Sequence, residues 1–240
     1  MAIEKRYERQ QDLYDASGVT LAIIGVGAVG RNAALQAAAI GVGSITIVDF
    51  DNVGPENLSA QGFKEIDIGL PKVQAVLREL KQINSEIDLM AIDDEYKPAQ
   101  TKSDVVFSCV DNITVRRTIF ETQRKKCKLF IDCRMSAEVC RVIKVDMSRP
   151  AECAHYESTL FAEGEAFEQR CTSKSTIYCA AITAALMISE LTKYLRGLEG
   201  PTDATLYIPP LQLIRGDRTA PAAPERPENE LEIDIEAVIE

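Results

Sequence analysis

A strand, a glycine-rich turn and a helix follow one another near the start of this chain, and this order constrains the fold more than any other feature. Residues 19–26, VTLAIIGV, form the dense aliphatic and β-branched run that is typical of a strand buried on both faces. An alanine-rich helix is expected over residues 30–42, and a second buried strand over residues 44–51. Together they predict a βαβ unit, which pairs its two strands in parallel through a right-handed crossover.

The same alternation of strands and helices continues along the chain. It predicts an α/β fold class: a Rossmann-like, mostly parallel sheet with flanking helices, plus late antiparallel strands and a C-terminal tail. Residues 1–16 are expected to form a charged, exposed helix. Further helices are expected at 71–84, 113–127 and 175–196, and further strands at 87–93, 103–112, 128–135, 138–146 and 204–215, the last interrupted by Pro209 and Pro210.

The chain divides into one large domain and a tail. Its 240 residues are enough to bury a sizeable core, which we assign to residues 1–215. Residues 216–229 are rich in proline, alanine and charge, and we interpret them as a linker. Residues 230–240, ELEIDIEAVIE, alternate apolar side chains with acids, so they are expected to dock as a strand with one apolar face or to form a free acidic tail.

The composition argues against several classes of partner. A formal net charge of −10 is a poor match for nucleic acid or for an anionic membrane surface, so neither is an expected partner. The longest apolar run, IYCAAITAALMI, is too short to span a bilayer, and we interpret it as a buried helix. Seven cysteines are an odd number and no secretion signal opens the chain, so a cytoplasmic protein with reduced thiols is expected.

The glycine turn predicts a phosphate site. Gly25, Gly27 and Gly30 permit a tight turn in which backbone N–H groups at a helix N-terminus approach a phosphate. Asp49, at the end of the second strand, is placed to bind ribose hydroxyls. These residues alone fit NAD and ATP equally well, and a glycine turn without any ligand is the structural alternative.

Four charged residues distinguish the two nucleotides. Three acids lie at or just after the ends of predicted strands, and one lysine begins a predicted helix: Asp49, Asp51, Asp111 and Lys72. The carboxyl ends of parallel strands line a ligand crevice, so these four side chains can converge there. Nucleotidyl transfer uses such groups, because Mg²⁺ prefers hard oxygen ligands and the reacting phosphates need cations. Hydride transfer needs neither, so the pattern favours ATP.

The chain contains five motifs in a fixed order: RYERQ, GVGAVG, VDFDNVGPENLSAQ, GLPK and CVDN. In order and spacing they resemble the ThiF/MoeB/HesA family, the bacterial relatives of ubiquitin-activating enzymes, from about Arg6 to Leu195. The resemblance implies that residues 1–215 form an ATP-binding adenylation domain that uses ATP and Mg²⁺. It also implies the substrate, the C-terminal glycine carboxylate of a ubiquitin-like protein or small sulfur carrier, which is adenylated with release of pyrophosphate.

The resemblance implies roles for individual residues of the nucleotide site. The backbone around Gly27 and Ala28 would face the phosphates, Lys72 would bind phosphate oxygens, and Asp111 would position Mg²⁺. The implied cofactor-binding set is Gly25, Gly27, Ala28, Gly30, Asp49, Asp51, Asn57, Gln61, Lys72, Asp111 and Asn112.

The implied catalytic set is Arg9, Lys72, Asp111 and Cys171. Arg9 matches the family's arginine finger, which reaches into the active site of the other subunit and so implies a homodimer; the alternative is a solvated helix charge. Cys171 stands where several relatives carry a cysteine that accepts the activated carboxylate as a thioester or acyl-disulfide. Basic neighbours favour its thiolate, and the alternative is an ordinary loop cysteine.

Two departures from the family pattern affect these expectations. The family often has an arginine directly before the glutamine that corresponds to Gln61, and here this residue is Ala60, so one phosphate-binding cation is missing unless Arg116, Arg117 or Arg134 replaces it. The chain also lacks the two Cys-x-x-Cys pairs that bind structural zinc in many relatives, so no zinc is expected. The chain therefore resembles the zinc-free branch, whose genes tend to neighbour those of ubiquitin-like, conjugating or deubiquitinase-like proteins; a conjugating-enzyme-like partner is a further expectation.

Two other functions stay open on the sequence alone. An inactive family member that acts as a binding module is consistent with Ala60, and an NAD-dependent dehydrogenase would use the same dinucleotide fold. Asp51, Lys72 and Asp111 argue against the dehydrogenase, as does the lack of a plausible catalytic histidine. His155 is the single histidine of the chain, and we assign it no role.

Overall fold

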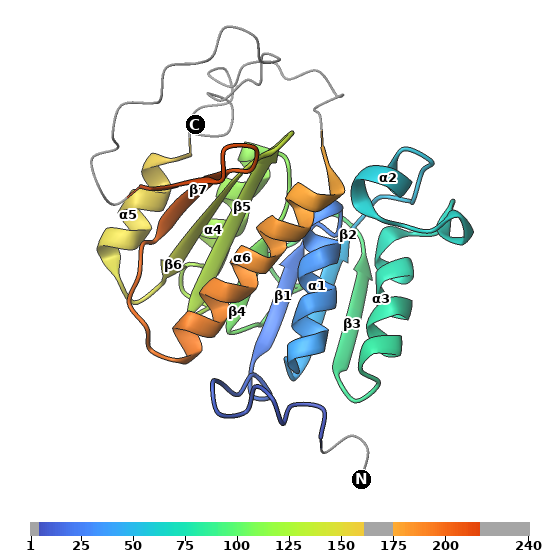
Figure 1. The fold of residues 1–240 in the computed structure, drawn as a ribbon, viewed down its shortest axis with the longest axis horizontal. Helices are drawn as coiled ribbons and strands as arrows, with labels where there is room; N and C mark the ends of the chain where they lie inside the picture. The colour runs from blue at the N-terminus through green and yellow to red at the C-terminus, as the bar shows by residue number, and fades with distance from the viewer. Residues whose placement is uncertain (1–4, 161–174, 217–240) are drawn as a thin grey trace, which may run out of the picture.

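One eight-stranded sheet organises the protein. The computed structural model describes residues 5–160 and 175–216, and its strands lie in the order β3-β2-β1-β4-β5-β6-β7-β8 (Figure 1). The first five strands pair in parallel, and β6, β7 and β8 extend the sheet in antiparallel pairing. This confirms the predicted Rossmann-like fold class with late antiparallel strands.

The strands and helices have the following bounds. The strands are β1 (Thr20–Ile24), β2 (Ser44–Asp49), β3 (Asp88–Asp93), β4 (Val105–Ser108), β5 (Leu129–Ser136), β6 (Val139–Asp146), β7 (Asp203–Tyr207) and β8 (Gln212–Arg215). The helices are α1 (Ala28–Ile40), α2 (Asn57–Gln61), the 3₁₀ turn η1 (Glu65–Asp67), α3 (Lys72–Ile83), α4 (Ile113–Gln123), α5 (Pro150–Ser158) and α6 (Ile177–Leu195). None of the helices within the described ranges combines the length and apolarity that crossing a membrane requires.

The winding of the chain reverses at β1. This strand pairs with β2 on one side and β4 on the other, so that Ile24 lies opposite both Val48 and Ser108. In a doubly wound sheet, such a switch point opens a crevice beyond the carboxyl ends of the strands. The glycine turn begins at Gly25, directly after β1 and therefore at this crevice.

Helices cover both faces of the sheet. The face under α1, α3 and α6 buries Ile23, Ala34 and Ala184, and the face under α4 and α5 buries Ile24 and Phe120. Successive side chains of a strand point to opposite faces, so β1 is apolar and buried from Leu21 to Ile24. The alanines of α1 leave room for α6 to pack beside it across the front of the sheet (Figure 1).

The N-terminal segment differs from its prediction. Residues 5–13 form turns and not the expected helix. Gln10 Nε2 donates a hydrogen bond to the carbonyl of Ile40 (2.7 Å), and Asn84 Nδ2 donates to the hydroxyl of Tyr7 (2.7 Å). These bonds fasten the segment to the C-terminal ends of α1 and α3, and such tertiary contacts override the local helical pattern.

The remaining elements agree with the predictions, with additions. The predicted late segment 204–215 is confirmed as two strands, β7 and β8, separated by a turn at Pro209 and Pro210. Helices α2 and α5 were not predicted, and α5 begins with Pro150 in its first turn, where proline is tolerated. Residues 217–240, which contain most of the predicted linker and the whole acidic tail, lie outside the described residues.

Candidate nucleotide-binding site

The glycine turn is packed too tightly for larger residues. Gly25 has a positive φ of 85°, and a Cβ added there would lie 2.7 Å from the carbonyl oxygen of Cys109 at the end of β4. A Cβ on Gly30 would lie only 1.9 Å from the carbonyl oxygen of Gly25. Both glycines are therefore required by the fold of the turn, and they seat it at the switch point.

Helix α1 begins at this turn with its backbone donors uncapped. Gly27 is the N-cap residue, no side chain from the described ranges caps the helix, and its first turn contains no acidic residue. The first N–H groups of a helix lack internal partners, and the helix dipole adds partial positive charge there. An anion bound at Gly27 and Ala28 would satisfy these groups.

Asp49 fastens the glycine turn from the neighbouring strand. Its Oδ2 accepts a hydrogen bond from the Val26 N–H (2.7 Å), and its Oδ1 accepts one from the Asp51 N–H (2.9 Å). Burial raises the pKa of the Asp49 carboxyl, and these two N–H groups act against that rise. Each oxygen retains a second lone pair, so the carboxylate can hold the turn and still accept from a ribose hydroxyl.

Lys72 and Asp51 form an ion pair at the same end of the sheet. Lys72 Nζ lies 2.8 Å from Asp51 Oδ2, and the lysine side chain is 7% exposed while the aspartate side chain is 50% exposed. Lys72 is the first residue of α3, as predicted. The structure thus brings together two of the predicted site residues, with the carboxylate facing solvent and the ammonium beneath it.

Helix α2 contributes one buried acceptor that has no partner. Asn57 is committed to the loop, because its Oδ1 accepts a hydrogen bond from the Gly54 N–H (2.8 Å). Gln61 Oε1 is buried and forms no hydrogen bond with the described residues. A Cβ on Gly27 would lie 3.6 Å from this oxygen and 3.9 Å from Nε2, so the Gln61 amide lies against the glycine turn. A buried acceptor is costly unless a ligand donates to it.

Asp111 and Asn112 follow β4 and have different roles. Asn112 caps α4, since its Oδ1 accepts a hydrogen bond from the Val115 N–H (3.0 Å). Asp111 is exposed, and its carboxylate makes no hydrogen bond or ion pair within the described part of the chain. Gly25 and Cys109 are in close contact, which places the loop of Asp111 beside the glycine turn.

One predicted catalytic residue, Arg9, is not brought to this end of the sheet by its own chain. Arg9 is exposed in the N-terminal segment, which Tyr7 and Gln10 hold at the far end of α1, opposite α2 (Figure 1). Helix α1 has 13 residues, so about 20 Å separates its two ends. Arg9 therefore lies away from the glycine turn of its own chain. Cys171 lies outside the described residues.

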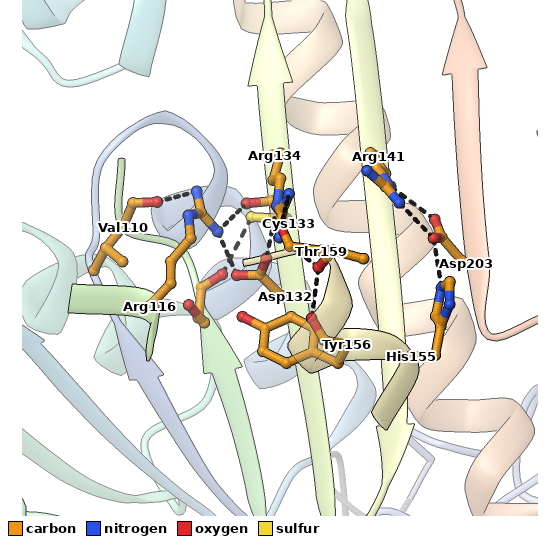
Figure 2. Close-up of polar contacts among 11 residues, drawn as sticks. Val110, Arg116, Asp132, Cys133, Arg134, Arg141, His155, Tyr156, Thr159 and Asp203 are labelled. Carbon is orange, nitrogen blue, oxygen red and sulfur yellow. Dashed lines mark hydrogen bonds and ion pairs between the residues drawn. The ribbon is translucent and has the colours of Figure 1, made fainter. Parts of the chain in front are cut away.

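The arginines expected to replace the missing family arginine are engaged elsewhere. Figure 2 shows Arg116 and Arg134 converging on Asp132 in β5, which is fully buried. Arg116 also donates to the carbonyl oxygens of Cys133 and Val110, and Arg134 donates to Thr159. Arg117 donates to the carbonyl of Leu160 (2.7 Å).

His155, to which the sequence assigned no role, has a structural partner. Its Nε2 lies 2.9 Å from Asp203 Oδ2, and Arg141 binds the same carboxylate through Nε (2.9 Å) and Nη2 (2.7 Å) (Figure 2). Burial would raise the pKa of Asp203, but Arg141 and His155 hold it below the usual range. The cluster ties α5, β6 and β7 together away from the glycine turn.

The sequence interpretation missed Arg31, the cation that contacts α2. Arg31 is 7% exposed and bonds to Glu79 in α3 and to the carbonyl oxygen of Gln61. The available signal was a lone charged residue in the alanine-rich helix GRNAALQAAAI. Its acidic partner stands 48 positions further along the chain, so sequence spacing could not identify the pair.

A substitution in the turn tests this packing. Gly30→Ala is expected to lower the free energy of unfolding by about 2 kcal/mol, because the added methyl group overlaps the Gly25 carbonyl. Gly18→Ala is the matched control, since a Cβ there meets nothing within 4 Å. Urea denaturation measures both variants, and equal stability of the two would show that the turn accommodates a side chain.

The carboxyl ends of β1, β2 and β4 therefore present free helix donors, a lysine, two exposed carboxylates and a buried acceptor. Such a set suits a ligand that carries phosphates at one end and hydrogen-bond donors at the other. Among the residues that the structure describes, no group of three or more histidines, cysteines or acids is arranged to hold a metal ion.

The fold and its glycine turn define an α/β protein of the Rossmann-like class. Within this class the chain belongs to the ThiF family, whose model matches residues 4–230. Over 116 residues it is 38% identical to the sulfur carrier protein ThiS adenylyltransferase of Escherichia coli, which covers 46% of this chain and 45% of that protein.

A longer alignment and a solved structure extend the comparison. Over 220 residues the chain is 28% identical to ubiquitin-like modifier-activating enzyme 5 of Drosophila pseudoobscura pseudoobscura, covering 81% of this chain and 53% of that protein. This chain spans about half the length of these curated relatives. The structure of E. coli MccB with ATP shares the fold, with a TM-score of 0.66 and 16% identity over 83% of this chain and 64% of that chain.

Proposed function

We propose that this protein is an ATP-dependent adenylyltransferase that activates the C-terminal glycine of a ubiquitin-like or sulfur-carrier protein. The observation that carries the proposal is the meeting of the glycine turn, the Asp51–Lys72 pair and the uncommitted Asp111 carboxylate at one switch point. The names of the relatives support it, since they include adenylyltransferases of a sulfur carrier and an activating enzyme of a ubiquitin-like modifier.

In the proposed reaction the partner's carboxylate oxygen attacks the α-phosphorus of ATP, and the bond to pyrophosphate breaks. The α1 N–H groups and Lys72 would bind the phosphate oxygens, while Asp49 and Gln61 would accept hydrogen bonds from the nucleoside. Mg²⁺ would neutralise charge on the phosphates, and Asp111 would be its protein ligand. Magnesium commonly has one or two carboxylate ligands beside substrate phosphates, which fits a site where Asp111 is the free carboxylate among the described residues.

The choice between ATP, NAD and no nucleotide is tested by binding. ATP with Mg²⁺ is expected to raise the melting temperature of the protein, because a ligand that binds only the folded state stabilises it. NAD at equal concentration is expected to leave it unchanged. A rise with NAD alone would favour the dehydrogenase, and no rise with either nucleotide would favour a binding module without nucleotide.

We propose a homodimer in which Arg9 acts in the site of the partner subunit. The distance between the N-terminal segment and its own glycine turn supports this arrangement. Arg9→Ala and Asp111→Asn homodimers are each expected to be inactive. Mixing them should restore about a quarter of wild-type activity, because half of the dimers are mixed and each has one intact site. Subunit exchange without recovery would show that Arg9 does not act in trans.

We also propose that the adenylate passes to Cys171. The thiolate would attack the acyl carbon, the bond to AMP would break, and a thioester would form for transfer to a conjugating-enzyme-like partner. A non-reducing gel of protein, ATP and partner should show a thiol-sensitive adduct that Cys171→Ala lacks. An adduct that survives in Cys171→Ala would assign the thioester to another cysteine.

The cytoplasm is the compartment that we propose for this activity. It supplies ATP, and its reducing conditions keep thiols free. The cysteines in the described parts of the chain are free thiols, which supports this placement.

A further inference from the structure

Arg31 joins three segments around the nucleotide site. It follows Gly30 directly in α1 and is 7% exposed. Its Nε and Nη2 donate hydrogen bonds to the two carboxylate oxygens of Glu79 in α3, both at 3.0 Å. This two-point geometry fixes the plane of the guanidinium and is among the strongest side-chain contacts in proteins.

The same guanidinium contacts three consecutive residues at the end of α2. Its Nη1 donates a hydrogen bond to the carbonyl oxygen of Gln61 (3.3 Å), and its central carbon lies 5.4 Å from the ring centre of Phe63. Gly62 between them has a φ of 77°, and a Cβ there would lie 2.9 Å from Nη1. The chain therefore turns around Arg31, and the position of Gln61 depends on it.

The charge of Arg31 is already balanced. Glu79 faces two cations, because Lys64 Nζ also lies 2.9 Å from its Oε1. The lysine side chain is 56% exposed, whereas those of Arg31 and Glu79 are about 10% exposed or less. Arg31 differs in this from Lys72, whose carboxylate partner Asp51 is 50% exposed. With both partners buried, the Arg31 guanidinium is suited to hold a neighbouring segment in place and not to bind a phosphate.

The consequence of this arrangement lies in the side chain of Gln61. Its backbone carbonyl is held by Arg31, while its amide lies against Gly27 with Oε1 buried and without a partner among the described residues. We propose that Arg31, locked by Glu79, is a positioning residue that aims Gln61 Oε1 at a hydrogen-bond donor of the bound nucleoside. This inference rests on the proposed function, because it assigns the partner of Gln61 to ATP.

The test measures the Kd for ATP by calorimetry, which needs no protein substrate. Arg31→Lys keeps the positive charge but loses the two-point geometry, and it is expected to raise the Kd about tenfold. Glu79→Gln is also expected to raise the Kd, because Arg31 loses its charged partner and is held less firmly. If Arg31 were instead a phosphate ligand, releasing it from Glu79 would lower the Kd, so the sign of this change decides between the two roles.

A double-mutant cycle separates positioning from general damage to the fold. Gln61→Met removes the acceptor and is expected to raise the Kd for ATP by a similar factor. Because Arg31 acts through Gln61, Arg31→Lys in the Gln61→Met background should add little. Multiplicative effects of the two substitutions would overturn the proposal. Lys64→Met, which touches Glu79 from the exposed side, is the matched control and should leave the Kd unchanged.

Failure of the proposed function and failure of the Arg31 role give different results. A wild-type protein that does not bind ATP would refute the proposed function. A wild-type protein that binds ATP, together with a folded Arg31→Lys variant of equal Kd, would refute only the role of Arg31. If Arg31→Lys does not fold, Glu79→Gln takes its place. The Kd for ATP is then compared between Glu79→Gln alone and Glu79→Gln combined with Gln61→Met.

Discussion

Asp111→Asn is expected to stop adenylation while the protein stays folded. Asp111 is exposed and makes no hydrogen bond or ion pair with the described residues, so the fold does not depend on its charge. In the proposed site its carboxylate is the protein ligand of Mg²⁺, and losing it should cost about 3 kcal/mol of transition-state stabilisation, or a rate decrease of more than about 100-fold. Pyrophosphate exchange measures the rate, and thermal melting measures the fold.

The matched control for Asp111→Asn is Glu121→Gln. Glu121 is an exposed acid on α4, the helix that follows Asp111, and the same change from acid to amide there should leave exchange intact. An Asp111→Asn protein that exchanges pyrophosphate at the rate of Glu121→Gln would remove Asp111 from the reaction and, with it, the proposed magnesium site.

Asp132→Asn is expected to lower the free energy of unfolding by about 3 kcal/mol, because it breaks a buried charge cluster. The Asp132 side chain is fully buried, and those of Arg116 and Arg134, which it binds, are each 8% exposed. Burial lowers the pKa of Arg134, but an arginine cannot lose its proton in a protein. In Asp132→Asn the guanidinium charges of Arg116 and Arg134 would therefore stay buried without the carboxylate that balances them. Urea denaturation measures the loss.

An exposed ion pair provides the comparison for Asp132. Asp104 pairs with Lys128 at 3.0 Å, but the two side chains are 42% and 68% exposed. Asp104→Asn should therefore change stability little, since water already screens this pair. Similar losses for Asp132→Asn and Asp104→Asn would show that burial does not set the strength of the Asp132 cluster.

The sequence predicted the core of the fold because its signals are local. The aliphatic run of β1, the glycines after it and the alanines of α1 are contiguous, and hydrophobic period and turn chemistry act over such distances. The convergence of Asp51 and Lys72 was also predictable, because Asp51 follows the end of β2 and the helix that Lys72 begins starts at the same edge of the sheet.

The remaining features depend on contacts between distant positions. The N-terminal segment has a helical pattern, but its bonds to Ile40 and Asn84 hold it in turns. Arg31 and Glu79 pair across 48 positions, and the local sequence shows a lone arginine in α1 but not its partner. The sequence predicts a ribose-binding role for Asp49. It does not predict the hydrogen bonds that Asp49 accepts from the Val26 and Asp51 N–H groups, because these depend on the folded backbone.

Pyrophosphate exchange with a defined partner tests the central claim most directly. The protein is incubated with ATP, Mg²⁺, labelled pyrophosphate and a ubiquitin-like protein that ends in Gly-Gly. Where a neighbouring gene encodes such a protein, that protein is the partner used. Label is expected to enter ATP with the intact partner and not with a partner that lacks the terminal glycine. Absence of exchange by a protein shown to bind both ATP and the intact partner would contradict adenylation as its function.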